Sequence, residues 1–195
     1  MSFARLREIE SSAGRTYWQT IARFAPTFEP VFAARVPEHW HTAGPRTSRV
    51  DTERARKAIT PVHAALNYVY AILEVEATIA AHIVGFDPSL GIMHADVRYR
   101  GSLATDLMEP VRPIADRLVL EILERRALAR GDVFETREGV CRIGSRMAGE
   151  LAALAPEFRD PLGPHAEQLA RSLTPTRRQA TPLTRANHRH AIAKA

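Results

Sequence analysis

One segment, from about Thr60 to Val84, constrains the fold of this chain more than any other. Its apolar residues recur at alternating steps of four and three positions, which is the spacing of a helix face. Further apolar residues fill another side, and a helix with so little polar surface is normally central and largely buried. Pro61 suits the first turn of that helix, and the run Gly-Phe-Asp-Pro that begins at Gly85 ends it.

Other segments have the same periodicity, and none has the alternation expected of a strand, so the predicted fold class is all-α. Ser102 is expected to cap a helix that continues through Ile122. Pro110 and Pro113 should kink this helix, because proline lacks the amide hydrogen that a helix interior needs. The remaining helices are expected to end at Pro26 and to span Arg137 to Leu154 and Pro164 to Leu173.

The composition favours a soluble protein. Of the 195 residues, 45% are hydrophobic and 25% are charged, which is an ordinary globular share. The chain has no apolar run of about 18 residues and no N-terminal signal core, so we expect a cytoplasmic protein with no membrane partner. Its single cysteine, Cys141, excludes an internal disulfide and a multi-cysteine zinc site, and it is expected in the core.

The sequence divides into a helical lobe, residues 1–174, and a basic tail, residues 175–195, that is expected to be mobile. Within the lobe, residues 26–57 contain four prolines and predict a long surface loop. Its His39 and His41 lack a carboxylate at a fixed spacing, which disfavours a metal site there. The chain carries 27 basic against 22 acidic residues, an excess that suits a polyanionic partner, although arginine-rich codon usage explains it equally well.

A line of polar side chains runs along the central helix. Such a line on a buried helix must meet water, a ligand or another polar group, so it is either an internal hydrogen-bond network or the floor of a binding cleft. Glu76, on the apolar side, could pair with an arginine from another helix. The polar line consists of His63, Asn67, Tyr70 and Glu74.

Three runs of residues resemble the CRISPR-associated protein Cas1 family, the integrase of CRISPR spacer acquisition. The resemblance covers about residues 5–155 and corresponds to the α-helical catalytic lobe of the family. The runs are Asn-Tyr-Val-Tyr-Ala from Asn67, the segment from Gly85 to His94 with its Gly-Ile-Met-His end, and Leu103 to Pro113 with Asp-Leu-Met-Glu-Pro.

The same resemblance implies a β-rich N-terminal domain that builds the family's homodimer, and the residues before Glu10 are too few to form one. We therefore expect either a truncated gene product or a genuine short form, and a homodimer of this chain is in doubt.

The resemblance also implies a divalent-metal site. Glu10, His94 and Glu109 match the family's three ligands, and Asp106 matches an acidic position beside the metal. Taken singly, each of these residues has an ordinary structural explanation, and only their joint pattern favours a site. Carboxylates suit Mg²⁺ and Mn²⁺, and an imidazole beside them favours tolerance of Mn²⁺.

The implied activity is that of a metal-dependent DNA endonuclease and integrase, which inserts short DNA fragments at a CRISPR repeat by phosphodiester transesterification. DNA and a Cas2 protein are the implied partners. The alternative is a non-catalytic or reduced Cas1-like DNA-binding module. His63 departs from the asparagine usual in the family. The residues expected to contact DNA are Asn67, Tyr70, Arg15, Arg98 and Arg112.

Overall fold

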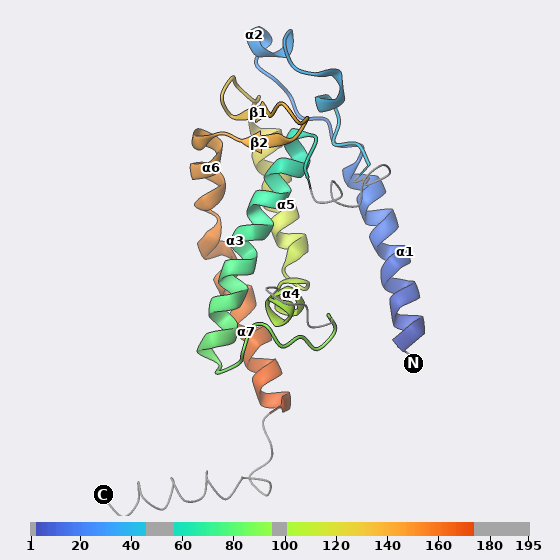
Figure 1. Ribbon diagram of the computed structural model, residues 1–195, viewed down its shortest axis with the longest axis vertical. Coiled ribbons are helices and arrows are strands. Elements are labelled where there is room, and N and C mark those ends of the chain that lie inside the picture. Colours follow the sequence, from blue (N-terminus) through green and yellow to red (C-terminus); the bar gives the residue numbers. More distant parts are fainter. Residues whose placement is uncertain (1–2, 46–56, 95–100, 174–195) are drawn as a thin grey trace, which may run out of the picture.

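A computed structural model describes residues 3–45, 57–94 and 101–173 and shows a helical bundle with one small β-hairpin (Figure 1). The predominance of helix confirms the predicted class, whereas the hairpin was not expected. The elements are α1 (Phe3–Ile21), α2 (Pro30–Ala33), the 3-10 helix η1 (Glu38–Trp40), α3 (Pro61–Ile83), α4 (Ser102–Met108), α5 (Arg112–Arg125), β1 (Val133–Glu135), β2 (Cys141–Ile143), α6 (Ser145–Ala152) and α7 (Ala155–Leu173).

The central helix is α3, as the sequence predicts. It packs against α4, α5, α6, α7 and β2, and much of its surface is buried. The Thr60 side chain accepts a bond from the His63 amide at 3.5 Å, and Pro61 occupies the first turn. Gly85 follows the helix with a φ of 83°, a conformation that favours glycine. Among the described helices, α3 alone is long and apolar enough to cross a membrane, a property shared by core helices of water-soluble proteins.

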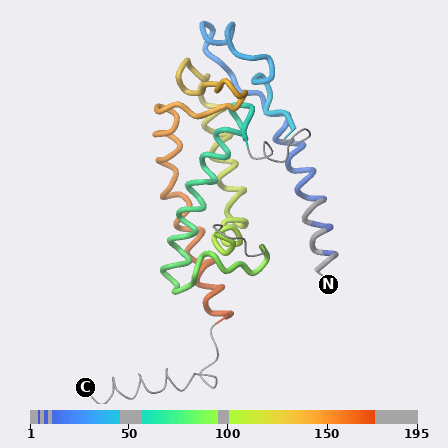
Figure 2. The backbone as a smooth tube through the Cα atoms, viewed as in Figure 1, coloured from blue at the N-terminus to red at the C-terminus, as the bar shows by residue number. Residues whose placement is uncertain are grey.

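The N-terminal helix α1 stands beside the bundle, as the backbone trace shows (Figure 2). Its last turns attach it, because Ile21 is buried and the Trp18 ring meets the His63 ring edge-on at 6.4 Å. Farther toward the N-terminus, Glu8 and Ile9 are exposed. The helix is therefore anchored at its C-terminal end.

The segment predicted as a helix from Arg137 to Leu154 is corrected by the structure. It begins in a turn, in which Gly139 has a φ of 72°, continues as β2 and becomes helical only at Ser145. Each strand of the hairpin has three residues, which is too short for a period of two to stand out. Cys141 is buried in β2, as predicted, and burial raises the pKa of its thiol to about 12.

A buried carboxylate fixes the hairpin to its surroundings. Asp132 is fully buried just before β1 and accepts bonds from Arg126 at 2.7 Å and from Arg146 at 2.8 Å. The Ala129 amide donates to the same carboxylate at 2.8 Å. Burial raises the pKa of Asp132, but these bonds outweigh it and hold the pKa far below its usual range.

Prolines account for two further corrections. The helix predicted from Ser102 through Ile122 is broken rather than kinked, because α4 ends at Met108 and α5 begins at Arg112. Conversely, α7 starts at Ala155 and continues through Pro161 and Pro164, where a helix start was predicted at Pro164. Buried side chains at steps of four hold α7 on the bundle across the prolines. They are Phe158, Leu162 and Ala166.

Ser102 is not the N-cap of α4. Gly101 holds that position, and Ser102 is the first, fully buried residue of the helix. The amides of Leu103 and Ala104 donate instead to the Pro88 carbonyl, at 2.9 and 3.3 Å. A preceding turn thus satisfies the helix amides that a serine cap would have satisfied.

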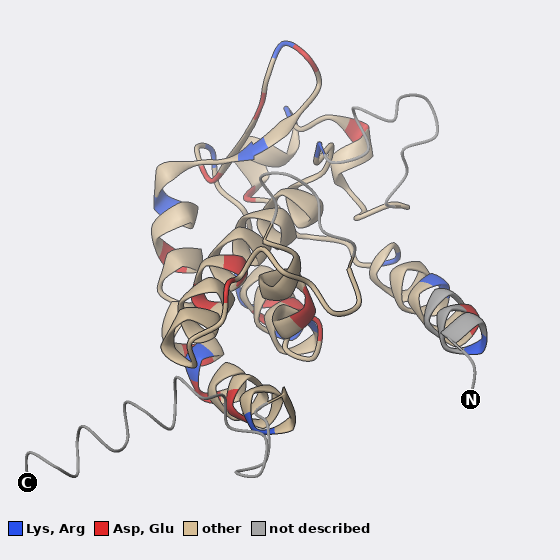
Figure 3. Ribbon diagram, turned by 60° about the horizontal axis from the view of Figure 1, so that its bottom comes forward, with Lys and Arg blue, Asp and Glu red and all other residues tan. Residues whose placement is uncertain are grey.

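Acidic and basic residues are interspersed over the helices (Figure 3). In the sequence, residues 1–173 contain 22 basic and 22 acidic residues. The tail from Thr174 onward adds five basic residues and no acidic one, so the entire formal net charge of +5 lies in the tail. The tail itself lies outside the described residues.

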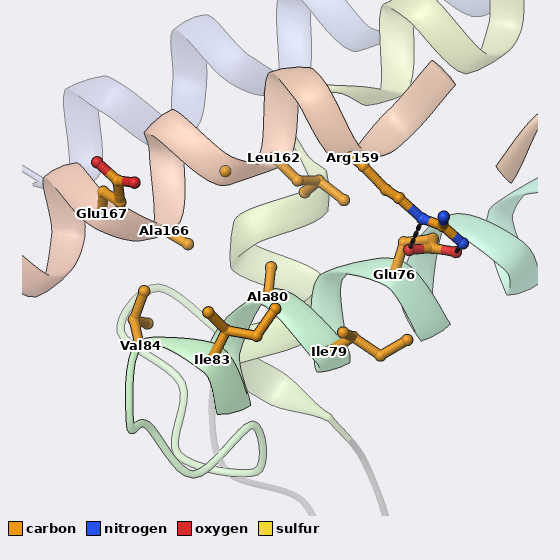
Figure 4. Close-up of a pocket in the computed structure, with 10 residues that line it drawn as sticks. Glu76, Ile79, Ala80, Ile83, Val84, Arg159, Leu162, Ala166 and Glu167 are labelled. Atoms are coloured by element: carbon orange, nitrogen blue, oxygen red, sulfur yellow. Dashed lines mark hydrogen bonds and ion pairs between the residues drawn. The ribbon is translucent and has the colours of Figure 1, made fainter. Parts of the chain in front are cut away.

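The buried Glu76 of α3 pairs with Arg159 of α7, which confirms the predicted partnership. Two bonds of 2.9 Å join the guanidinium and the carboxylate in parallel (Figure 4). The pair lies at the edge of an apolar groove between the two helices, lined by Ile79, Ile83 and Leu162 among others. This ion pair offsets the cost of a carboxylate on the apolar side of α3.

Candidate active site

The turn between α3 and α4 carries His94 and is closely fitted. The Asp87 carboxylate accepts bonds from the Ser89 amide at 2.9 Å and the Ser89 hydroxyl at 2.7 Å. A Cβ atom at Gly91 would lie 2.3 Å from the His94 carbonyl oxygen, so only glycine fits there. The turn is therefore held in one shape that brings His94 back over α4.

Asp106 of α4 is the centre of this turn. Its carboxylate accepts three backbone bonds, from the amides of Ile92 at 2.6 Å, Met93 at 2.9 Å and His94 at 3.1 Å. It also meets the ring nitrogen Nδ1 of His94 at 2.5 Å. Because both oxygens are engaged, Asp106 positions the turn and the imidazole.

The charge of Asp106 is strongly stabilised. Burial alone raises the pKa of this carboxyl, but the bonds from the His94 ring and the three amides outweigh burial and hold the pKa below its usual value. The bond at Nδ1 makes Nε2 the ring nitrogen that His94 can present to a ligand. A carboxylate on one ring nitrogen is the usual arrangement around a metal-binding histidine, and the His94 side chain keeps 31% of its surface exposed.

Glu109 follows α4 as its C-cap residue and points toward a different partner. Its carboxylate accepts a bond of 2.9 Å from Arg112, and 38% of its side-chain surface is exposed. The guanidinium of Arg112 also lies 5.0 Å from the centre of the Tyr70 ring. Asp106 and Glu109 were predicted on one helix face. In the structure, Asp106 accepts hydrogen bonds from the His94 turn, and Glu109 pairs with Arg112.

Asp116, which the sequence analysis did not single out, joins three helices. It is buried in α5 and accepts hydrogen bonds from the hydroxyls of Tyr17 on α1 and Tyr70 on α3. Burial, and then the bond to Asp116, raise the pKa of Tyr17 well above its ordinary value. Glu10 lies on the same helix as Tyr17, so this link fixes the helix that carries it. The side chain of Glu10 lies outside the described residues.

The polar line of α3 does not form one surface. His63 is buried beside Trp18, and Tyr70 is buried against Asp116 and Arg112, which agrees with the internal network. Asn67 lines a different pocket, of about 350 Å³, together with Lys57 and Arg142.

The remaining predicted residues are spread over the molecule. Glu74 is exposed on α3, and Arg15 is exposed on α1, where it lines a shallow pocket with Gly14 and Trp18. Arg98 lies outside the described residues. Within residues 3–45, 57–94 and 101–173, no three histidine, cysteine or acidic side chains with described positions converge as a metal site. The set of Glu10, His94 and Glu109 stays a prediction, since the Glu10 side chain was not part of that comparison.

The solved structures that share this fold include a casposase and a Cas1–Cas2 assembly. A casposase bound to its integration product superposes with a TM-score of 0.59 at 25% sequence identity, over 71% of this chain and 44% of that one. The partial Cas6-RT-Cas1–Cas2 complex superposes with a TM-score of 0.63 at 22% identity, over 87% of this chain and 49% of that one. The first of these is bound to an integration product.

The sequence comparisons identify the family. The model of the family described as CRISPR associated protein Cas1 matches residues 1–154, and the chain belongs to that family. It is 36% identical to a CRISPR-associated endonuclease Cas1 of Archaeoglobus fulgidus over 80% of its own length, and 32% identical to one of Thermus thermophilus over 87%. The matches span 41% and 51% of those two relatives, so the chain corresponds to about half of their length.

Proposed function

We propose that this chain is the α-helical catalytic lobe of a CRISPR integrase, a divalent-metal-dependent DNA endonuclease that joins short DNA fragments to a repeat by phosphodiester transesterification. The observation that supports it best is the His94–Asp106 pair, because a carboxylate buried under three amides orients one imidazole with its Nε2 available. Membership of the Cas1 family and the likeness to a casposase support the same reaction class.

Glu10, His94 and Glu109 would hold the ion, and the donor set of two carboxylates and one imidazole suits Mg²⁺ or Mn²⁺. Such an ion supplies charge neutralisation at the phosphate and activation of the attacking oxygen. Asp106 keeps the proton on Nδ1 of His94 and thereby leaves Nε2 as the electron-pair donor. Arg112, beside Glu109, supplies a fixed positive charge for a phosphate oxygen of the bound DNA.

The partners in this proposal are DNA and a Cas2 protein. The chain shares its fold with a chain of the partial Cas6-RT-Cas1–Cas2 complex, and this likeness supports Cas2 as a partner. Within the chain itself, the five basic residues of the tail provide a sequence-independent attraction for DNA.

The test is nicking of supercoiled DNA by the full chain in the presence of Mn²⁺, with and without a chelator. His94→Ala should abolish nicking, while His165→Ala, which changes an exposed histidine of α7, should nick like the wild type. Both variants should melt within a few degrees of the wild type. Full nicking by His94→Ala would remove His94 from the site. Wild-type protein that binds DNA but never nicks it would favour the non-catalytic binding module instead.

A further inference from the structure

Asp116 of α5 is linked through two tyrosines to two of the three proposed metal ligands. Its buried carboxylate accepts a hydrogen bond from Tyr17 of α1 at one oxygen and from Tyr70 of α3 at the other. A buried polar network with its bonds made rigidifies its surroundings and specifies one arrangement of them. Three helices are thus held in one arrangement by a single buried charge.

The first tyrosine leads to Glu10. Tyr17 and Glu10 are seven positions apart on α1, which is close to two full turns, so both positions lie on the same face of the helix. The bond from Tyr17 to Asp116 determines which face of α1 is turned toward α5. It therefore fixes the rotation of α1 about its own axis, and with it the face on which position 10 lies.

The second tyrosine leads to Glu109. The Arg112 guanidinium lies 5.0 Å from the centre of the Tyr70 ring and donates to the Glu109 carboxylate at 2.9 Å. Both side chains of this ion pair are partly exposed, and such a pair contributes little when nothing else restrains it. The buried Tyr70 ring beside the guanidinium is that restraint, because cation–π attraction favours one position of the charge over the ring. The position of Tyr70 therefore determines where Arg112 holds Glu109.

We propose that Asp116 is a positioning residue of the candidate active site. Through its two tyrosines it sets the separation between Glu10 and Glu109. Ligands that come from different helices must be held within about 0.5 Å of the productive geometry, and only a rigid support does this before the ion binds. The third ligand, His94, is oriented by Asp106 within its own turn. The inference rests on the proposed function, because it assumes the metal site formed by these three ligands.

The experiment is a Mn²⁺ titration of the full chain followed by electron paramagnetic resonance, at a temperature where circular dichroism shows the variants folded. Asp116→Asn offers one acceptor oxygen in place of two and should weaken Mn²⁺ binding about tenfold, the lower end of the usual effect of losing a residue that orients metal ligands. Tyr17→Phe and Tyr70→Phe keep their rings and lose one bond each, so each should weaken Mn²⁺ binding several-fold. These two variants decide the question if Asp116→Asn does not fold.

Asp132→Asn is the matched control. It also changes a buried carboxylate that accepts several hydrogen bonds, but this carboxylate belongs to the hairpin. The control should lose stability and keep the Mn²⁺ affinity of the wild type. A merely structural role of Asp116 would give the same result as this control.

Nicking of supercoiled DNA gives a second readout that separates positioning from general damage. The Asp116, Tyr17 and Tyr70 variants should need more Mn²⁺ for half-maximal nicking and should approach the wild-type rate when Mn²⁺ is saturating. General loss of structure would lower the rate at every Mn²⁺ concentration and would contradict the positioning role.

The failure of this inference differs from the failure of the proposed function. Wild-type Mn²⁺ affinity in the folded Asp116 and tyrosine variants, with weakened affinity in His94→Ala, would overturn the positioning role and leave the metal site intact. Equal losses of affinity in Asp116→Asn and Asp132→Asn would overturn it as well. A wild-type chain that binds no Mn²⁺ would refute the proposed function and this inference with it.

Discussion

Tyr17 and Asp116 are 99 positions apart in the sequence, and a hydrogen bond between their side chains ties α1 to α5. The Asp116 carboxylate is 3% exposed and receives the Tyr70 hydroxyl as well. A buried carboxylate is tolerated where hydrogen bonds replace the water it has lost. The bond therefore both satisfies Asp116 and attaches the helix that carries Glu10.

Replacing Tyr17 by phenylalanine removes this bond and keeps the ring. We expect Tyr17→Phe to lower the free energy of unfolding by about 1.5 kcal/mol, because the lost partner is a charged, buried acceptor. Urea denaturation measures the change, and hydrogen exchange should become faster along α1 but not along α3. Tyr68→Phe on α3 is the matched control and should change stability by less than about 0.5 kcal/mol. Equal effects of the two substitutions would contradict the anchoring role.

Asp106 is expected to act on His94 and not on the fold alone. Asp106→Asn should weaken Mn²⁺ binding and Mn²⁺-dependent nicking by about 10- to 100-fold, the usual effect of losing the residue that orients a metal-binding histidine. Mn²⁺ titration followed by electron paramagnetic resonance gives the affinity directly. Asp160→Asn, which changes an exposed aspartate of α7, is the control and should retain Mn²⁺ affinity. An unchanged affinity in Asp106→Asn would show that the imidazole needs no such orientation.

The hairpin should make stability depend on acid pH through Asp132. Its folded-state pKa is depressed, so its contribution is present above the unfolded pKa of about 3.9 and is lost as the pH falls toward the folded value. At pH 7, Asp132→Asn should lower the free energy of unfolding by about 3 kcal/mol, because two arginines lose their buried partner. The difference from wild type should shrink below about pH 4. A difference that stays constant from pH 7 to pH 3 would contradict this account.

The tail should control the salt dependence of DNA binding. Deleting residues 175–195 removes all five excess positive charges and leaves 22 basic and 22 acidic residues. The slope of log affinity against log salt on duplex DNA should therefore flatten by up to about 4.5, while the melting temperature stays the same. A tail with the five basic residues replaced by glutamine separates charge from length. Wild-type slopes in both variants would assign DNA binding to the helical lobe alone.

The long central helix was predicted correctly, whereas breaks within other predicted helices and relationships between distant residues were not. The limits of α3 follow from a pattern repeated over six turns. Glu76 could be predicted to have a partner because a carboxylate on the apolar side of a helix is costly when it is unpaired. The strands of the hairpin have three residues each, so no period can reveal them. Proline signals were ambiguous, since Pro110 lies in the break between α4 and α5, Pro113 lies in the first turn of α5, and Pro161 lies inside α7.

In the candidate site, the resemblance pointed to His94 and Asp106, and the structure shows them in contact. The three amides that converge on Asp106 come from the shape of a turn, which residue types alone do not specify. No sequence pattern near Asp116 predicts that it is buried or bonded to two tyrosines. It stands among charged and apolar residues on an ordinary amphipathic helix, and its partners are 46 and 99 positions away.

The attachment of α1 by its last turns makes that helix a lever. Glu10 precedes Tyr17, which Asp116 holds, by seven residues, so at about 1.5 Å per residue it lies about 10 Å along the helix from that attachment. A swing of about 10° there would carry the backbone of Glu10 through about 2 Å, close to the length of a metal–oxygen bond. In the proposed site, contacts made with the outer half of α1 would therefore set the distance between Glu10 and His94 without repacking the bundle.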